Sequence, residues 1–227
     1  MDRLRRDRRQ LTPELLLRAY AAGIFPMAEG RQEKTIFWVD PERRGVIPLD
    51  GFHTPRRLRR TVRSGLFDVR ADTAFHDIVS ACALTAEKRQ ETWINDEIIQ
   101  AYTELHTLGF AHSVECWQGD KLAGGLYGIA LGGAFFGESM VSFARDASKV
   151  ALVHLVARLR LGGFKLLDSQ FTTPHLSRFG VIEIPRRDYL EKLSDAFAVK
   201  ATFYRNPPPE EMAAALEGAL QSSTQTS

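Results

Sequence analysis

The sequence contains little cysteine and has no long apolar run. Cys82 and Cys116 are the two cysteines in 227 residues, and they provide neither a disulfide framework nor the paired spacing of a structural zinc site. We therefore expect a reduced, cytoplasmic protein. No stretch of about twenty apolar residues is present, so no membrane-spanning helix is predicted. The charged start MDRLRRDRRQ has no apolar segment behind it, and no secretory signal is expected.

Several catalytic motifs are also missing. The six histidines form no HExxH or comparable pair, so no catalytic metal is predicted. Ser139 lies in GESM, which lacks the second glycine of a nucleophile elbow, and this disfavours a Ser-His-Asp enzyme. The glycine-rich GLYGIALGG does not match the GxxxxGK[ST] loop of ATP-binding proteins.

Charge is distributed unevenly along the chain. Residues 1–70 hold 16 Lys and Arg against 9 Asp and Glu, although the net charge of the whole chain is only +2. A basic first third suggests an anionic partner, of which nucleic acid is the commonest. The arginines concentrate in RRLRRTVRSG, a predicted helix in which Arg56, Arg57, Arg59 and Arg60 surround an apolar stripe of Leu58 and Val62. Phosphate binding and a solvated linker helix both fit this pattern.

Hydrophobic periodicity and cap residues predict an α+β fold. Residues 1–10 carry charge without periodicity and are expected to form a mobile arm. Thr12-Pro13 and Asn95 are predicted helix starts, and Asp146 is predicted to begin a central helix over 147–161. The predicted strands are 35–39, 45–49, 66–70, 112–117, 121–131, 133–139, 166–170 and 181–185. We expect a small N-terminal α/β domain, residues 1–52, and a larger domain, residues 53–227, with a mixed, mostly antiparallel central sheet.

The order of elements in the larger domain resembles acyltransferases with the GNAT-like fold. Two helices, an antiparallel meander, a long helix and a further strand follow one another there. GNAT enzymes bind an activated acyl donor where central strands splay apart. Their RxxGxG/A loop for coenzyme A is absent before the central helix of this chain. The resemblance concerns the fold and does not fix the chemistry.

Two strands next to the central helix carry carboxylates. AFFGES leads into Glu138 and KLLDSQ contains Asp168, with Gln170 two residues further on. Residues two apart in a strand share a face, so Asp168 and Gln170 are predicted to point the same way. Strand, helix and strand with polar groups at the strand ends is a common way to build a catalytic cleft. Ordinary strand-end polar residues are the alternative interpretation.

Several collinear stretches are similar to leucyl/phenylalanyl-tRNA–protein transferases. They are YAAGIFP, WVDPERRGVIPL, TWI, AYTELHTLGFAHSVECW, GGLYGIALGGAFFGESM, ASK, LLDSQ and IPRRDYL. The resemblance implies transfer of Leu or Phe, and Met less well, from aminoacyl-tRNA to the N-terminal Arg or Lys of a protein. The product would enter N-degron proteolysis. No cofactor is implied, because the aminoacyl ester is already activated, and nothing requires more than a monomer.

The resemblance also implies roles for particular residues. Asp168 would be the base, Gln170 its polar relay, and Glu138 the group that positions an amino group or the ribose. The aminoacyl side chain would bind an apolar pocket, and the terminal adenosine of tRNA would lie near Trp93, Tyr20 and Met27. Arg56, Arg57, Arg59 and Arg60 would contact tRNA phosphates. Core packing is a strong alternative reason for the apolar residues assigned to that pocket, and Met140 and Trp93 are the better candidates for binding. The pocket residues are Met140, Leu126, Phe135, Leu152, Leu155 and Leu167.

Departures from the family pattern leave donor preference open. Met27 replaces the usual Trp after GIFP, Val141-Ser142-Phe143 replaces Phe-Ser-Arg, and Ser169 replaces Cys. Two other functions remain open from the sequence: an acyltransferase that takes its acyl group from coenzyme A, and a non-catalytic tRNA-binding adaptor. Natural protein targets are not encoded in any pattern of the chain.

Overall fold

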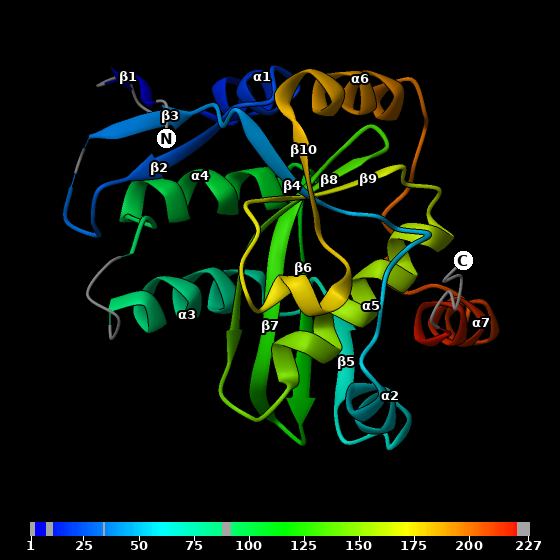
Figure 1. Ribbon diagram of the computed structural model, residues 1–227. Helices are drawn as coiled ribbons and strands as arrows, with labels where there is room; N and C mark the ends of the chain where they lie inside the picture. The colour runs from blue at the N-terminus through cyan, green and yellow to red at the C-terminus, as the bar shows by residue number, and fades with distance from the viewer. Residues whose placement is uncertain (1–2, 8–10, 34, 88–91, 222–227) are drawn as a thin grey trace.

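A computed structural model describes residues 3–7, 11–33, 35–87 and 92–221 (Figure 1). The α-helices are α1 Pro13–Ala21, α2 Arg56–Arg63, α3 Phe75–Glu87, α4 Asp96–Thr107, α5 Ala147–Leu161, α6 Arg186–Phe197 and α7 Pro209–Leu220, with a 3-10 helix, η1, over Leu176–Phe179. The strands are β1 Arg3–Asp7, β2 Phe25–Ala28, β3 Ile36–Val39, β4 Arg43–Ile47, β5 Asp68–Ala71, β6 Ala111–Gln118, β7 Lys121–Leu131, β8 Ala134–Ser142, β9 Leu166–Gln170 and β10 Ile182–Pro185.

A small sheet with strand order β1-β3-β2 contains the first strands of the chain. The expectation of an unstructured arm over residues 1–10 is wrong for Arg3–Asp7, which pairs antiparallel with β3. Strand pairing uses main-chain groups, so a charged edge strand without an alternating pattern escapes detection from sequence. Residues 1–2 and 8–10 of the predicted arm lie outside the described residues.

The larger sheet has seven strands in the order β10-β4-β9-β8-β7-β6-β5. All neighbouring strands in it are antiparallel except the β8–β9 pair, which is parallel. The prediction of a mixed, mostly antiparallel sheet in an α+β fold is therefore confirmed. β4 precedes the predicted domain boundary at residue 52, yet it lies between β10 and β9 in this sheet. The N-terminal segment thus contributes to both sheets, and the division at residue 52 remains a prediction.

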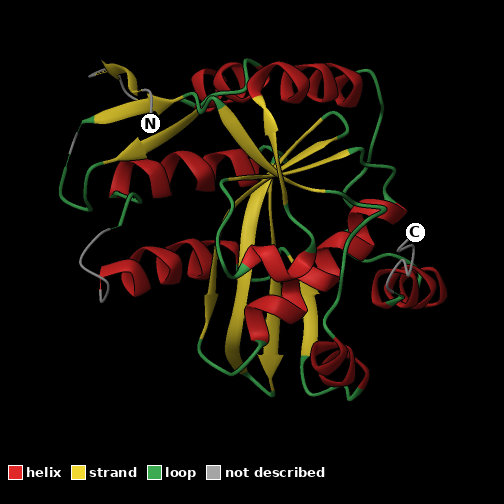
Figure 2. Cartoon of the chain, in the orientation of Figure 1, coloured by secondary structure: helices red, strands yellow, loops and turns green. Residues whose placement is uncertain are grey.

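Helices cover both faces of the larger sheet, with α3 and α4 on one side and α5 on the other (Figures 1 and 2). Neighbouring residues of the central strands alternate between these two layers, as β-geometry requires. Tyr127 and Phe136 belong to the core that includes α3 and α4, whereas Leu126 and Phe135 belong to the core that includes α5. No helix among the described residues is long and apolar enough to cross a membrane.

Two of the predicted helix starts are capped as expected. The Thr12 hydroxyl accepts a hydrogen bond from the Leu15 amide at 3.2 Å, and Asn95 Oδ1 accepts one from the Ile98 amide at 2.8 Å. The bounds of α5 also match their prediction, but Asp146 does not cap it. Asp146 has a φ of 66°, and its carboxylate pairs with a lysine side chain instead.

Candidate active site between two diverging strands

The site lies where β8 and β9 stop pairing. Their parallel ladder covers three residue pairs and ends at Phe136 and Asp168. Beyond that point β8 continues from Gly137 to Ser142 and β9 from Ser169 onward, and both segments line a cavity of about 890 Å³. Where two neighbouring strands separate, their main-chain groups and side chains become accessible, whereas a continuous sheet would bury them.

A smaller apolar pocket opens from the same place. Its volume is about 90 Å³, and it shares Glu138, Ser139, Met140, Ser169 and Leu176 with the larger cavity. Five of the six predicted aminoacyl-pocket residues line it, namely Leu126, Met140, Leu152, Leu155 and Leu167. The pocket is thus formed by side chains from the α5 side of the sheet, and its mouth carries a carboxylate.

Phe135, the sixth predicted pocket residue, lines neither cavity. It is fully buried, and its ring packs against Phe164 and Phe203. The pocket instead includes Ile47 from β4 and Leu176 from η1. No pattern in the sequence identified these two residues, because non-local contacts bring them to the pocket.

Glu138 lies at the junction of the two cavities within a hydrogen-bond network. Its Oε1 accepts from the Tyr20 hydroxyl at 2.7 Å and from Gln170 Nε2 at 2.9 Å, and its Oε2 accepts from the Tyr102 hydroxyl at 3.1 Å. The two tyrosine hydroxyls are also hydrogen-bonded to each other. Burial raises the pKa of Glu138 to about 7, although these hydrogen bonds act in the opposite direction. A carboxyl group with this pKa exchanges a proton readily at neutral pH.

Asp168 is fully buried, and its carboxylate oxygens accept hydrogen bonds from other residues of the protein. It accepts hydrogen bonds from Arg44 Nε at 3.0 Å and Arg44 Nη2 at 2.6 Å, from the Tyr189 hydroxyl at 2.8 Å and from the Gln170 amide at 2.7 Å. A carboxylate with about four acceptor positions has none left for a substrate amine. This geometry does not fit the expectation that Asp168 is the base.

Arg44 is the partner of Asp168 that the sequence reading missed. Its guanidinium lies 4.6 Å from the ring centres of both Phe25 and Tyr189, and its Nη1 donates to the Gly23 carbonyl at 2.9 Å. Burial opposes the charge on Arg44, but Asp168 outweighs burial and raises the pKa of Arg44. The run ERRGV shows an ordinary basic pair, and only the pairing of β4 with β9 reveals that its second arginine is buried.

Gln170 connects Asp168 with Glu138. Its φ of 62° interrupts the alternation of β9, so its amide binds Asp168 while its side chain reaches Glu138. The expectation that Asp168 and Gln170 point the same way assumes an extended residue 170 and stays a prediction. The left-handed backbone at Gln170 instead links a buried ion pair to the cavity wall.

The residues predicted to meet adenosine separate into two groups. Trp93 and Met27 are half-buried and line the large cavity. The segment of Trp93 is held against β2 by a hydrogen bond from the Ala28 amide to the Trp93 carbonyl at 3.1 Å. Tyr20 is fully buried and contacts Glu138, so its position does not fit an adenosine contact.

The α2 arginines also differ in position. Arg57 lines the large cavity, Arg56 and Arg60 are exposed on the helix, and Arg59 Nε donates to the Thr54 carbonyl at 2.7 Å. Leu58 and Val62 are buried, as the sequence predicted. Among the described residues, no group of three or more His, Cys, Asp or Glu side chains could hold a metal ion.

Comparisons with known proteins agree over most of the chain. A family model described as leucyl/phenylalanyl-tRNA protein transferase matches residues 46–194, and the model of that family's N-terminal domain matches residues 9–42. The chain is 65% identical over 189 residues to the leucyl/phenylalanyl-tRNA–protein transferase of Phenylobacterium zucineum, covering 83% of this chain and 86% of the relative. It is 56% identical over 214 residues to the enzyme of that name from Maricaulis maris, covering 94% and 97%.

Proposed function

This chain belongs to the leucyl/phenylalanyl-tRNA–protein transferase family, and we propose that it transfers the aminoacyl group of a charged tRNA to the α-amino group of a protein, with Glu138 at the reacting centre. One observation carries the assignment of the site. Glu138 lies at the point where an apolar pocket meets an open cavity, between strands that have ceased to pair. A bound aminoacyl ester needs this combination of an apolar recess and a polar reacting end.

The donor binds with its side chain in the apolar pocket. Leu126, Leu152 and Leu155 surround a Leu or Phe side chain there without offering it a polar partner. The terminal adenosine lies in the larger cavity beside Trp93 and Met27, where the indole supplies a stacking surface. This placement puts the ester carbonyl at the mouth of the pocket, next to Glu138.

The reaction then needs alignment and a path for one proton. The acceptor nitrogen attacks the ester carbonyl carbon, a C–N bond forms, and the bond from that carbon to the ribose oxygen breaks. Glu138 accepts the proton that the nitrogen loses and returns a proton to the departing ribose oxygen. Three of its roughly four acceptor positions are used by Tyr20, Tyr102 and Gln170, which leaves one for the incoming amine. Its raised pKa suits both transfers.

Asp168 acts in this scheme as a positioning residue. Its ion pair with Arg44 fixes β4 against β9 and holds the Gln170 amide, so that the Gln170 side chain stays directed at Glu138. The rate advantage of the site then comes largely from orientation of the reactants. We assign the base to Glu138 and the support of its geometry to Asp168, Arg44 and Gln170.

The finer identity of the reaction rests on the family resemblance. We propose that acceptors carry an N-terminal Arg or Lys, that Leu and Phe are the main donors, and that products enter N-degron proteolysis in the cytoplasm. We also propose that the enzyme needs no cofactor and works as a monomer. Exposed cationic side chains on α2, including Arg56 and Arg60, offer contacts for tRNA outside the cavity.

The test is transfer of radiolabelled Leu or Phe from charged tRNA to a peptide that starts with Arg. The purified protein is expected to form labelled peptide with Leu-tRNA and Phe-tRNA. A peptide with a blocked N-terminus serves as the control for attack by other amines. Absence of product with every charged tRNA, in the presence of tRNA binding, would contradict the proposed activity and favour an adaptor.

A further inference from the structure

Part of the wall of the large cavity is cationic. Four positively charged side chains line the cavity: Arg57 from α2, Arg145 just before α5, Lys149 in the first turn of α5, and Arg178 from η1. We call these four residues the cationic rim. They come from three separate elements of the chain, so neither a single charge run nor a single helix end accounts for their meeting at one cavity.

The Asp146 carboxylate lies within ion-pair distance of three of the four cations. It lies 2.6 Å from Lys149 Nζ, 3.8 Å from Arg57 Nη2 and 4.0 Å from Arg145 Nε. The Asp146 side chain is only 12% exposed, whereas those of Arg57 and Arg145 are 61% and 75% exposed. One carboxylate thus holds the cations together but does not balance their charge, and the excess is positive and accessible from the cavity.

His175 adds a polar group to the same wall. Its Nε2 is buried and has no hydrogen-bond partner among the described residues. Burial together with the nearby Lys149 and Arg178 lowers the pKa of His175, so the ring is neutral near pH 7. The His175 ring therefore adds a polar side chain to this wall without adding positive charge at that pH.

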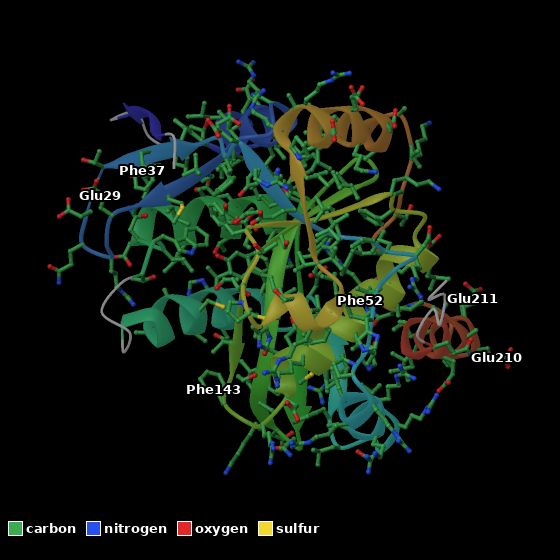
Figure 3. All side chains as sticks on the ribbon, viewed as in Figure 1. Glu29, Phe37, Phe52, Phe143, Glu210 and Glu211 are labelled. Carbon is green, nitrogen blue, oxygen red and sulfur yellow. The ribbon has the colours of Figure 1, made fainter. Side chains whose placement is uncertain are left out.

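The rim is rigidly attached to the body of the protein. η1 is fixed at its end, because the Phe179 ring stacks on the Phe52 ring with ring centres 5.7 Å apart and the Phe179 carbonyl accepts a hydrogen bond from the His53 amide at 3.0 Å. Phe52 is labelled in Figure 3. At the start of α5, the Ser148 amide already donates to the Ser142 hydroxyl at 2.9 Å. The Ser148 amide is therefore not free to bind an anion, and the positive charge of this wall comes from side chains.

We propose that the cationic rim binds the phosphodiester groups of the unpaired nucleotides that precede the aminoacylated adenosine of the donor tRNA. This inference rests on the proposed function. If the adenosine lies beside Trp93 and its ester beside Glu138, the preceding phosphates must leave through the same cavity, and the rim supplies the positive charge there. Arginine and lysine are the usual partners of single-stranded backbone phosphates. Arg57 would then join the rim to the exposed α2 arginines, which makes one basic track from the ester to the body of the tRNA.

Three donor substrates of increasing length distinguish a failure of this proposal from a failure of the proposed function. They are phenylalanyl-adenosine, which has no phosphodiester, a phenylalanyl-CCA trinucleotide, and phenylalanyl-tRNA. Transfer to an Arg-starting peptide is measured as kcat/KM for wild type, for the double variant Arg145→Gln/Arg178→Gln, and for Lys149→Met. Arg187→Gln is the matched control, because this exposed α6 arginine pairs with Glu191 away from the cavity lining. The two exposed rim positions make misfolding of the double variant easy to exclude by thermal unfolding.

The rim variants are expected to lower kcat/KM about tenfold with the trinucleotide and with the full tRNA, and to leave phenylalanyl-adenosine unchanged. The slope of log kcat/KM against log salt should fall in magnitude by about 0.7 for each cation removed. An equal loss with phenylalanyl-adenosine, or a loss with full tRNA only, would overturn the proposal. Failure of wild type to use any of the three donors would contradict the proposed function itself.

Discussion

Replacing Glu138 by Gln tests the carboxylate at the junction of the two cavities. Burial raises the pKa of this group from 4.5 to about 7, so the folded protein keeps a proton that the unfolded chain releases. This stabilising contribution is complete below pH 4.5 and disappears as the pH rises through 7. The difference between the two pKa values corresponds to about 3 kcal/mol, which wild type loses across this window and Glu138→Gln does not.

The assay compares urea unfolding of the two proteins between pH 5 and 8, where the titrations of other groups cancel in the difference. Glu138→Gln should gain stability relative to wild type as the pH rises. Transfer by wild type should increase through an apparent pKa near 7, whereas the variant should lose about 10²-fold to 10⁴-fold in rate together with that pH dependence. Parallel stability curves, or an unchanged pH–rate profile, would refute the role of Glu138.

Glu115→Gln is the matched control for that experiment. Glu115 is a second buried carboxylate whose pKa burial raises, and it lines neither of the two cavities of the site. Its side-chain hydrogen-bond partners include Ser113, on the same strand β6, and Thr73, between β5 and α3. The control should alter the pH dependence of stability and leave the transfer rate unchanged.

Four further substitutions test the surrounding architecture. Asp168→Asn and Arg44→Met should each lower the free energy of unfolding by about 3–5 kcal/mol, because each leaves a buried charge unpaired. Denaturant unfolding of both single variants and of the double variant forms a double-mutant cycle. The double variant should lose less free energy of unfolding than the sum of the two single losses. Gly45→Ala would place a Cβ 2.6 Å from the main-chain carbon of Phe171, so thermal unfolding should show a loss of about 1–3 kcal/mol, and no loss would mean that β9 moves freely. Leu126→Phe fills the apolar pocket and should reduce kcat/KM for Phe about tenfold more than for Leu, whereas equal losses would place the aminoacyl side chain elsewhere.

Local signals in the sequence were enough for most elements of the fold. Asn95 capped α4 as predicted because a side chain three residues from its target amide needs no tertiary information. β1 could not be found in this way, since its pairing with β3 depends on main-chain contacts between segments that α1 and β2 separate in the sequence. The position of β4 in the larger sheet could not be predicted from the sequence for the same reason.

The sequence predicted which residues form the site better than it predicted how those residues are arranged. The family resemblance brought Glu138, Asp168 and Gln170 together, and they do form one network. The division of roles among them follows from Arg44, whose burial depends on strand order, and from the left-handed backbone of Gln170. Neither can be deduced from a pattern of residue types, because both are consequences of non-local packing.

The central claim is that the aminoacyl ester lies at the mouth of the apolar pocket beside Glu138. A crystal structure with an amide-linked, non-reactive analogue of phenylalanyl-adenosine tests it most directly. The phenyl group should lie among Leu126, Leu152 and Leu155, with the reacting carbonyl one hydrogen bond or one bridging water from the Glu138 carboxylate. A phenyl group outside this pocket, or a carbonyl separated from Glu138 by protein side chains, would contradict the account.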